Sequence, residues 1–197
     1  MFENKKTNIK NLTELVCHSG GASGADTHWE ELTDLNGGKA YAYSYKTTYH
    51  NSKNVIEISE KDYEEGILEV RKANKYLKRG NINPYMHLLS RNWQQTKNSN
   101  HIIAVSSILQ KTKSPIIKGG TGYAVMMAFI HNKPITVFDQ FENKCYEWSY
   151  ITNVFHEKGV KDIYIIDKNF TGIGSRTLTE NGKQFINTVF ENMKSII

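Results

Sequence analysis

The chain is poor in cysteine, in proline and in paired metal ligands. Of its 197 residues only two are cysteines, Cys17 and Cys145, and three are prolines. Two cysteines cannot build a disulfide framework or a structural zinc site, and the seven histidines show no H-x-x-x-H pairing. We therefore expect reduced thiols and no metal site.

Long apolar runs are also missing. No stretch approaches the roughly 20 apolar residues that span a bilayer, and the opening MFENKKTNIKN has no apolar segment behind its basic residues. We expect a cytoplasmic protein without a membrane partner. No internal repeat or proline-rich linker divides the sequence, so residues 1–197 are expected to form a single domain.

Basic residues outnumber acidic ones. The chain has 25 Lys and Arg against 20 Asp and Glu, which gives a net charge of +5 and a pI of about 9.0. This balance favours anionic partners such as nucleotides or nucleic acid. Much of the excess lies on one side of a predicted helix, at Arg71, Lys72, Lys75, Lys78 and Arg79. A solvated helix face is the simplest interpretation, and an anion-binding surface is the alternative.

Short apolar runs alternate with longer segments of helical period. This predicts an α/β fold with a Rossmann-like open, mainly parallel sheet and helices on both faces. The predicted strands are Leu15–His18, Ala40–Tyr45, His101–Ser106, Pro134–Phe138 and Asp162–Ile166. The predicted helices are Ser23–Leu35, Lys61–Arg79, Pro84–Asn98, Tyr123–Asn132 and Leu178–Ile197, the last with a capping-box pattern at Thr177 and Glu180. Thr47–Ser59 and Phe141–Val160 fit the alternation poorly and are expected to be loops or short extra strands over the site.

Three glycine-rich stretches each lead into a predicted helix. They are HSGGASGAD at His18–Asp26, KGGTGYAVMMA at Lys118–Ala128 and FTGIGSRTLTE at Phe170–Glu180. We interpret all three as turns. Strand-to-helix turns of a parallel sheet lie together at the carboxyl ends of the strands, so the three are expected to share one crevice. None matches G-x-G-x-x-G or G-x-x-x-x-G-K-[ST], so neither an ordinary NAD enzyme nor a P-loop ATPase is indicated.

Glycine turns at helix starts suit anions, because the backbone approaches closely, several N–H groups point the same way and the helix dipole adds positive charge. Phosphate is the natural ligand, with hydroxyl and basic side chains as further donors. The candidate residues in these stretches are Ser19, Gly20, Gly21, Ser23, Gly24, Asp26, Lys118, Gly119, Gly120, Thr121, Gly122, Gly174, Ser175 and Arg176. Alternatively, Ser23 and Asp26 only cap a helix start.

Candidates also lie outside the glycine-rich stretches. Arg91 is either a ligand contact or a surface ion-pair former. Asp139, with Gln140 after it, ends a predicted strand and either contacts ribose hydroxyls or forms a turn. A base could stack on one of four aromatic residues, although such residues more often lie in the core: Trp93, Tyr123, Tyr146 and Trp148.

These stretches resemble the SLOG superfamily, the Rossmann-like proteins that include the Lonely Guy phosphoribohydrolases, the DNA-processing protein DprA and molybdenum-carrier proteins. SGGASGAD is similar to the S-G-G-x-x-G-A-D turn of the molybdenum-carrier-like branch. RNWQQTKNSNHIIAVSSI, KGGTGYAVMMAFIHNKPITVFDQ and FTGIGSR resemble a group of bacterial and phage proteins within it. The similarity runs from about Leu15 to the last helix.

The resemblance implies a homo-oligomer with a pocket for a nucleotide or a related phosphorylated ligand. By matching positions, the pocket would be lined by Gly20, Gly21, Gly24, Asp26, Gly119, Gly120, Thr121 and Gly122, with Arg91 nearby. The chain departs from the P-G-G-x-G-T-x-x-E motif of the phosphoribohydrolases, because Lys118, Tyr123 and Met126 replace its Pro, Thr and Glu. Methionine cannot exchange a proton, so hydrolysis by that route is not expected.

The sequence therefore predicts a protein that senses or sequesters a nucleotide-like ligand and uses no separate cofactor. One alternative is an enzyme that hydrolyses a nucleoside phosphate or an NAD-derived molecule, with Asp26 or Asp139 as its acid or nucleophile. Another is single-stranded nucleic-acid binding, which the net positive charge of the chain suggests. Molybdate carriage is a fourth interpretation, because oxyanions suit the same amides.

Overall fold

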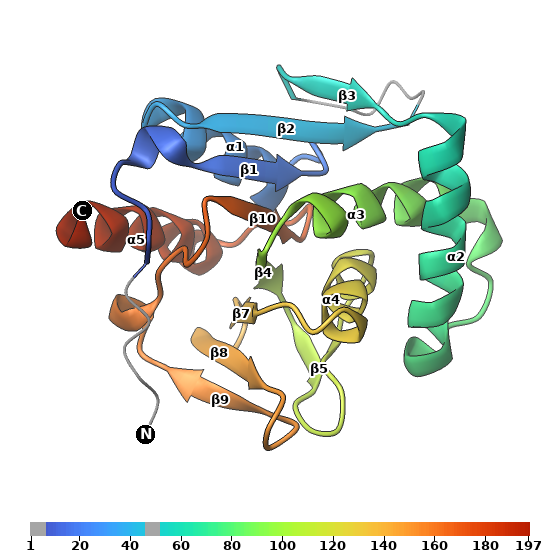
Figure 1. Ribbon diagram of the computed structural model, residues 1–197. Helices are drawn as coiled ribbons and strands as arrows, with labels where there is room; N and C mark the ends of the chain where they lie inside the picture. Colours follow the sequence, from blue (N-terminus) through green and yellow to red (C-terminus); the bar gives the residue numbers. More distant parts are fainter. Residues whose placement is uncertain (1–6, 46–51) are drawn as a thin grey trace.

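A computed structural model describes residues 7–45 and 52–197 and shows an α/β fold around an eight-stranded sheet (Figure 1). The strand order is β3-β2-β1-β10-β4-β7-β8-β9, and only β8 and β9 run antiparallel to their neighbours. The strands are β1 (Val16–Ser19), β2 (Lys39–Ser44), β3 (Val55–Glu57), β4 (His101–Ser106), β7 (Ile135–Asp139), β8 (Lys144–Ser149), β9 (Val154–Lys158) and β10 (Asn169–Gly174). The predicted open, mainly parallel sheet is confirmed.

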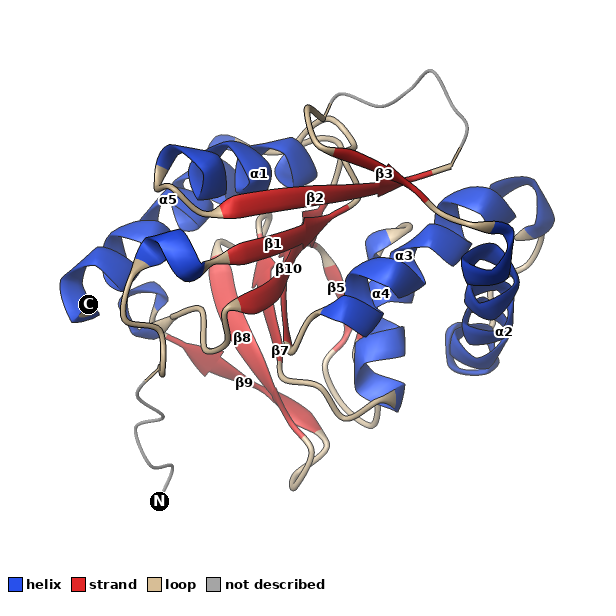
Figure 2. Ribbon diagram, turned by 45° about the horizontal axis from the view of Figure 1, so that its top comes forward, coloured by secondary structure: helices blue, strands red, loops and turns tan. Residues whose placement is uncertain are grey.

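Helices cover both faces of the sheet, as Figure 2 shows. Helices α1 (Ala25–Leu35) and α5 (Glu180–Ile196) lie on one face, and α2 (Glu60–Leu77), α3 (Met86–Asn98) and α4 (Thr121–Ile130) lie on the other. Short 3-10 helices occupy Leu12–Glu14, Asn83–Tyr85 and Val160–Asp162. Strands β5 (Ile108–Gln110) and β6 (Ile116–Ile117) form a separate hairpin that leads into α4. The layered arrangement agrees with the sequence expectation.

Aromatic packing joins α1 and α5 to the sheet. The Trp29 ring of α1 is fully buried and meets Phe170 of β10 edge-on, with ring centres 5.9 Å apart. Phe185 of α5 stacks on Phe138 of β7 at 4.5 Å. Each such side chain contributes on the order of 2 to 3 kcal/mol by leaving water. This core fixes the beginning of α1 against the end of β10.

The third glycine-rich stretch is a turn only in its second half, so the prediction is wrong for Phe170–Gly174. Its first residues form β10, which pairs with β1 on one side and β4 on the other. A side chain at Gly172 would clash with the Trp29 ring, and one at Gly174 would clash with Ala25 of α1. The glycines are there because α1 packs directly on the strand backbone. The turn itself begins only at Ser175.

The strand predicted at Asp162–Ile166 is also wrong. The segment leaves the 3-10 helix Val160–Asp162 as unpaired extended chain. Ile163 and Ile165 are buried, which produces the alternating pattern of a strand. The backbone is held instead by the amide of Asn192 in α5, which donates to the carbonyls of Val160 and Ile163. A side chain thus replaces the strand partner.

Smaller differences concern the element ends and the two unassigned tracts. Phe141–Val160 contains β8 and β9, and Thr47–Ser59 contains β3, although residues 47–51 lie outside the described part of the chain. The cap of α5 is Thr179, whose hydroxyl accepts from Gly182, rather than the predicted Thr177 with Glu180. The N-cap of α1 is Gly24, which has no side chain, rather than Ser23.

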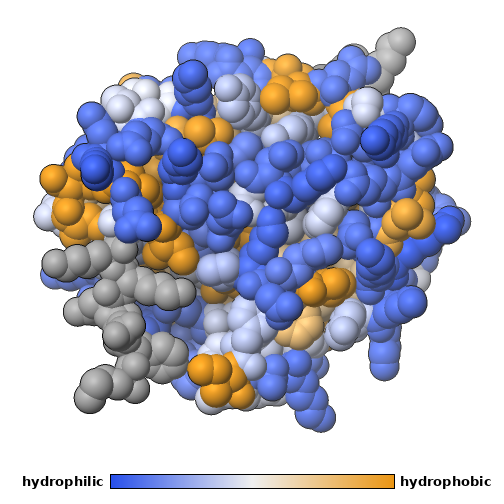
Figure 3. All heavy atoms as spheres, viewed as in Figure 1, coloured by the Kyte–Doolittle hydropathy of each residue, from blue (hydrophilic) through white to orange (hydrophobic). Residues whose placement is uncertain are grey.

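The face of the molecule drawn in Figure 3 is mainly hydrophilic, with apolar residues in separate small groups. Extensive apolar patches mark protein contacts, and this face shows none among the residues described. Within residues 7–45 and 52–197, no helix has both the length and the apolar character needed to cross a membrane.

Candidate functional site

A cleft of about 390 Å³ lies at the carboxyl ends of β10, β4 and β7. Nine predicted candidates line it: Asp26, Arg91, Lys118, Gly119, Gly120, Thr121, Gly174, Ser175 and Arg176. The other seven lie outside the lining: Ser19, Gly20, Gly21, Ser23, Gly24, Gly122 and Asp139. The predicted convergence therefore occurs, with a narrower set of residues.

The cleft occupies the point where the strand order reverses. From β1 the chain builds β2 and β3 on one side, then crosses through α2 and α3 to place β4 and β7 on the other. The crevice at such a reversal is the usual ligand position in open α/β sheets. Here β10 is inserted between β1 and β4. The last two residues of β10 and the turn after it, Ile173 to Thr177, therefore contribute to the lining.

Arg91 of α3 is the most deeply placed basic group in the cleft. Its side chain is 6% exposed, and its Nη1 is buried with no hydrogen-bond partner among the described residues. Its closest acidic contact is Asp26 Oδ2, 4.0 Å from Nη1, which exceeds a hydrogen-bond distance. Buried guanidinium groups are normally paired, because an unpaired charge in the interior is costly. Arg91 lines the cleft, so its buried charge favours an anion there.

Gly20 makes room for Arg91. A Cβ on Gly20 would fall on the Arg91 guanidinium, so no other amino acid fits there without displacing the arginine. Glycine in the first stretch was expected to let a phosphate approach the backbone. The structure shows that Gly20 admits an arginine side chain instead.

Asp26 stands beside Arg91 at the beginning of α1. Its Oδ1 accepts a hydrogen bond of 2.9 Å from the Gly174 N–H, which ties α1 to the end of β10. Burial raises the pKa of Asp26 to about 6, although Arg91 and the Gly174 N–H act in the opposite direction. Near neutral pH this carboxyl group can therefore hold or release a proton inside the cleft.

Gly24 fixes the approach of the first turn to the β10 end. Its φ of 100° lies in a region that L side chains rarely adopt, and a Cβ there would clash with the Ser175 and Arg176 carbonyls. The next residue, Ala25, donates its N–H to the Ser175 carbonyl at 3.1 Å. The first and third stretches are thus in direct contact, as their shared place at the cleft requires.

Asp139 binds backbone N–H groups, whereas a contact with ribose hydroxyls or a catalytic role was expected. It is 2% exposed, and its carboxylate accepts three backbone N–H groups: those of Ile108, Phe141 and Glu142. The carboxylate is occupied by these backbone donors, and Asp139 is not part of the cleft lining. Asp139 therefore supports the cleft walls and is no candidate for a catalytic acid or a ribose contact.

The second glycine-rich stretch presents free amides at the start of α4. The N–H groups of Gly119, Gly120 and Thr121 have no acceptor within the described residues. All three residues line the cleft. Three open amides together with the positive end of a helix dipole form a site for an anion.

Arg79 holds this stretch from the side away from the cleft. Its guanidinium donates to the carbonyls of Ile117 and Gly119, and it lies 5.2 Å from the centre of the Tyr123 ring. Arg79 was expected to lie on a solvated helix face, but it is half-buried and structural. The other basic residues of that group, Arg71, Lys72, Lys75 and Lys78, are exposed.

Asn92 of α3 supports the next peptide, because its side-chain amide donates to the Gly120 carbonyl at 3.1 Å. The described peptides are all trans, so each carbonyl points opposite to the N–H of the same peptide. Fixing the Gly119 and Gly120 carbonyls therefore also fixes the directions of the Gly120 and Thr121 N–H groups. Arg79 and Asn92 thereby preset the open amides.

Lys118 and Arg176 add mobile positive charge at the rim. Both side chains line the cleft and are exposed, unlike the buried Arg91. Three basic residues therefore face the single acidic residue of the lining, Asp26. The cleft is suited to an anion, with a fixed cation inside and two adaptable ones at its edge.

None of the four aromatic residues singled out in the sequence lines the cleft. Trp93 and Tyr123 pack among the helices, whereas Tyr146 and Trp148 belong to β8 and pack with residues of the sheet and of α4. The aromatic residue in the lining is Phe141, which follows β7 and is 67% exposed. No local pattern distinguishes it from other surface residues, so only its place beside the end of β7 could have indicated it.

Other lining residues were also missed by sequence reasoning. They are Ala22, Leu88, Ser107, Phe141, Ile173 and Thr177. Ser107 and Ile173 lie at the carboxyl ends of strands, a position that indicates a ligand site. Leu88 comes from α3 one turn before Arg91, so the helical repeat places both on one face.

The described residues contain no group of three or more His, Cys, Asp or Glu that could hold a metal ion. The polar groups at the cleft are amides, hydroxyls and cations, which bind anions. Comparison with protein-family models, curated proteins and solved structures finds no match to this chain. Its function must therefore be inferred from its own residues.

Proposed function

We propose that this protein binds a nucleotide or a nucleotide-derived phosphorylated ligand in the cleft. The observation that carries the proposal is that the buried cation Arg91 lines the same cleft as the open amides of Gly119, Gly120 and Thr121. A phosphate group would supply acceptors for both. Each charge-assisted hydrogen bond of this kind contributes about 1.5 to 3 kcal/mol.

The resemblance to the SLOG superfamily supports the same site, because its matching residues include Asp26, Arg91 and the Gly119–Thr121 amides. Binding without turnover, as in sensing or sequestering, is favoured by Met126. This residue replaces the family glutamate and is fully buried between α4 and the neighbouring helices, outside the cleft lining. It supplies no acid at the ligand.

The phosphate site is tested by titrating the purified protein with ribose 5-phosphate in a calorimeter. Arg91→Met should weaken binding at least tenfold, and Lys118→Met should weaken it about threefold. Lys118 is exposed, so its replacement leaves the core intact. Arg71→Met, on the exposed side of α2, is the matched control and should bind as the wild type does.

Two results would contradict the proposal. One is the absence of ribose 5-phosphate binding at millimolar concentration by the folded wild-type protein. The other is equal affinity in the wild type, Lys118→Met and a folded Arg91→Met variant. Mass spectrometry of small molecules released on denaturation gives an independent check, because a co-purified nucleotide would identify the ligand class.

A second function, hydrolysis of a ribosyl bond, is favoured by the pKa of about 6 of Asp26 inside the cleft. In that reaction water forms a bond to the ribose carbon C1′, the C1′–N bond breaks, and the base leaves with a proton. Asp26 would supply or accept that proton. Incubation with nucleoside monophosphates should then release free base, and Asp26→Asn should abolish the release. Release that persists in the variant excludes this role.

A further inference from the structure

We infer that Phe141 stacks on the base of the bound ligand and thereby selects nucleotides over other phosphorylated molecules. This inference rests on the proposed function, because it assigns the second half of the same cleft. It is carried by three features: the exposure of Phe141 at the cleft, the fixed turn that presents it, and further apolar residues in the same lining.

Phe141 is exposed at a place where its ring borders the cleft. The residue is 67% exposed and belongs to the lining, whereas the four aromatic residues first considered are buried elsewhere. Leu88 and Ile173 add apolar surface to the same lining, so the cleft has an apolar part in addition to its cationic part. A ligand that fills it has to combine an anionic group with a flat apolar one.

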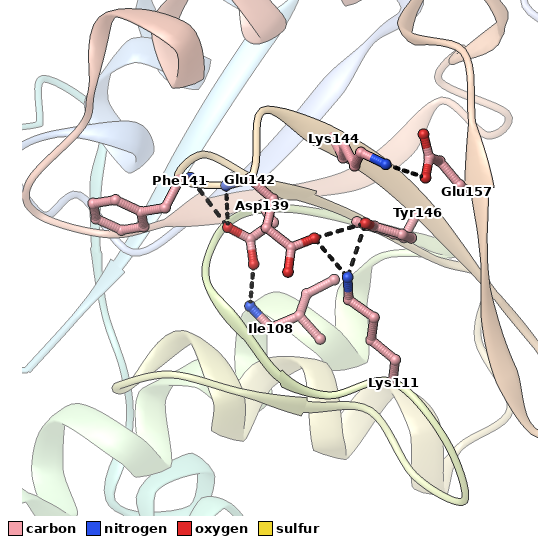
Figure 4. Close-up of polar contacts among 8 residues, drawn as sticks. All are labelled: Ile108, Lys111, Asp139, Phe141, Glu142, Lys144, Tyr146 and Glu157. Carbon is pink, nitrogen blue, oxygen red and sulfur yellow. Dashed lines mark hydrogen bonds and ion pairs between the residues drawn. The ribbon is translucent and has the colours of Figure 1, made fainter.

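The turn that presents the ring is held by Asp139. Oδ1 of Asp139 accepts the N–H groups of Phe141 at 3.1 Å and Glu142 at 3.2 Å, and Oδ2 accepts the Ile108 N–H at 2.7 Å. Figure 4 shows this carboxylate between the two segments, with the Phe141 ring directed away from the polar cluster. One buried carboxylate thus fixes both the β5 start and the backbone of Phe141.

The residues on each side of Phe141 are fixed as well. On one side the Gln140 side chain accepts from the Thr179 N–H and donates to the Thr177 carbonyl. On the other side Glu142 accepts from Lys111 Nζ at 2.5 Å and from the Tyr146 hydroxyl at 2.7 Å (Figure 4). The backbone of Phe141 and the side chains of its two neighbours, Gln140 and Glu142, are therefore all held by hydrogen bonds.

A rigid, exposed ring is suited to stacking. Aromatic side chains lose little conformational entropy on binding, and a fixed backbone lowers that cost further. Stacking on a base is insensitive to which base is bound, since every base has a π-face. The cleft volume of about 390 Å³ lies in the range of small-ligand sites, which fits a mononucleotide. Inorganic oxyanions such as molybdate would leave the ring unused.

The test compares ribose 5-phosphate with the four common ribonucleoside monophosphates, by calorimetry on the full chain. At least one nucleotide should bind about tenfold more tightly than ribose 5-phosphate. Phe141→Ala should remove this advantage while ribose 5-phosphate binds as before, and Phe141→Trp should retain it. Ile151→Ala, which removes another exposed apolar side chain outside the cleft lining, should change neither affinity.

The outcomes separate the two proposals. If ribose 5-phosphate binds but no nucleotide binds more tightly, the role of Phe141 is refuted and the phosphate site stands. If Phe141→Ala weakens ribose 5-phosphate and the nucleotides equally, the ring acts on the fold and the stacking role is likewise refuted. If none of the five compounds binds the folded wild type, the proposed function itself fails.

Discussion

The guanidinium of Arg91 occupies the space that a side chain on Gly20 would fill. The two residues are far apart in the sequence, on α3 and in the turn after β1. Their contact helps to place the arginine at the cleft, where the strand order reverses. In the proposed function, the first glycine-rich stretch acts through the cation that it admits.

Gly20→Ala should therefore displace Arg91 and impair binding. We expect a loss of ribose 5-phosphate binding and only a small loss in the free energy of unfolding, because the guanidinium is the end of a flexible side chain that can move away from the new Cβ. Gly80→Ala is the control, because a Cβ at Gly80 meets nothing within 4 Å. Urea unfolding and calorimetry measure the two effects. Wild-type affinity in Gly20→Ala would show that the position of Arg91 is irrelevant.

Arg79→Met should loosen the anion-binding amides without touching the ligand. The variant loses the donors to the Ile117 and Gly119 carbonyls, so we expect a stability loss of about 2 kcal/mol and a roughly tenfold weaker affinity for ribose 5-phosphate. Arg79→Lys should be intermediate, because a point charge cannot serve both carbonyls as the planar fork does. Arg71→Met should match the wild type. A stable Arg79→Met variant with unchanged affinity would contradict the positioning role.

His101 should make the fold sensitive to acid. The imidazole is 2% exposed and lies 3.0 Å from the Thr136 hydroxyl, and burial lowers its pKa to about 3. The unfolded chain binds this proton at about pH 6.5, so the stability is fully present above that pH and is lost as the pH falls toward 3. Between pH 6.5 and 4.5 the loss from this residue is about 2 to 3 kcal/mol. His101→Gln should remove that part of the pH dependence in urea unfolding; parallel profiles would argue against it.

Asp26 should act in the opposite direction. Burial raises its pKa from 3.8 to about 6, so its favourable contribution is present below about pH 3.8 and is lost as the pH rises through 6. Asp26→Asn keeps an acceptor for the Gly174 N–H and has no titrating group. The stability of the variant relative to the wild type should therefore rise by about 2 kcal/mol between pH 4 and pH 7.5. A constant difference across this range would show that Asp26 does not titrate there.

Local sequence patterns determined much of the framework. Apolar periodicity predicted the five main helices and the strands β1, β2, β4 and β7. The position of the glycine-rich stretches before helices predicted that they lie at the carboxyl edge of the sheet. These features depend on neighbouring residues, since periodicity and turn preferences act over one or two turns of chain. The same reasoning misread Gly172 and Gly174 as turn glycines, because a glycine under a packed helix looks the same in sequence.

Only the tertiary structure decided which groups meet in the cleft. The insertion of β10 between β1 and β4, the contact of Arg91 with Gly20, and the place of Phe141 all join segments distant in the sequence. Strand pairing and side-chain packing of this kind depend on the shape of the whole core, and no local pattern encodes them. The sequence by itself therefore determined that the chain has an α/β sheet with glycine-rich stretches at its carboxyl edge. The packing decided that Arg91 lies within the cleft, that Asp139 supports its wall, and that Phe141 borders it.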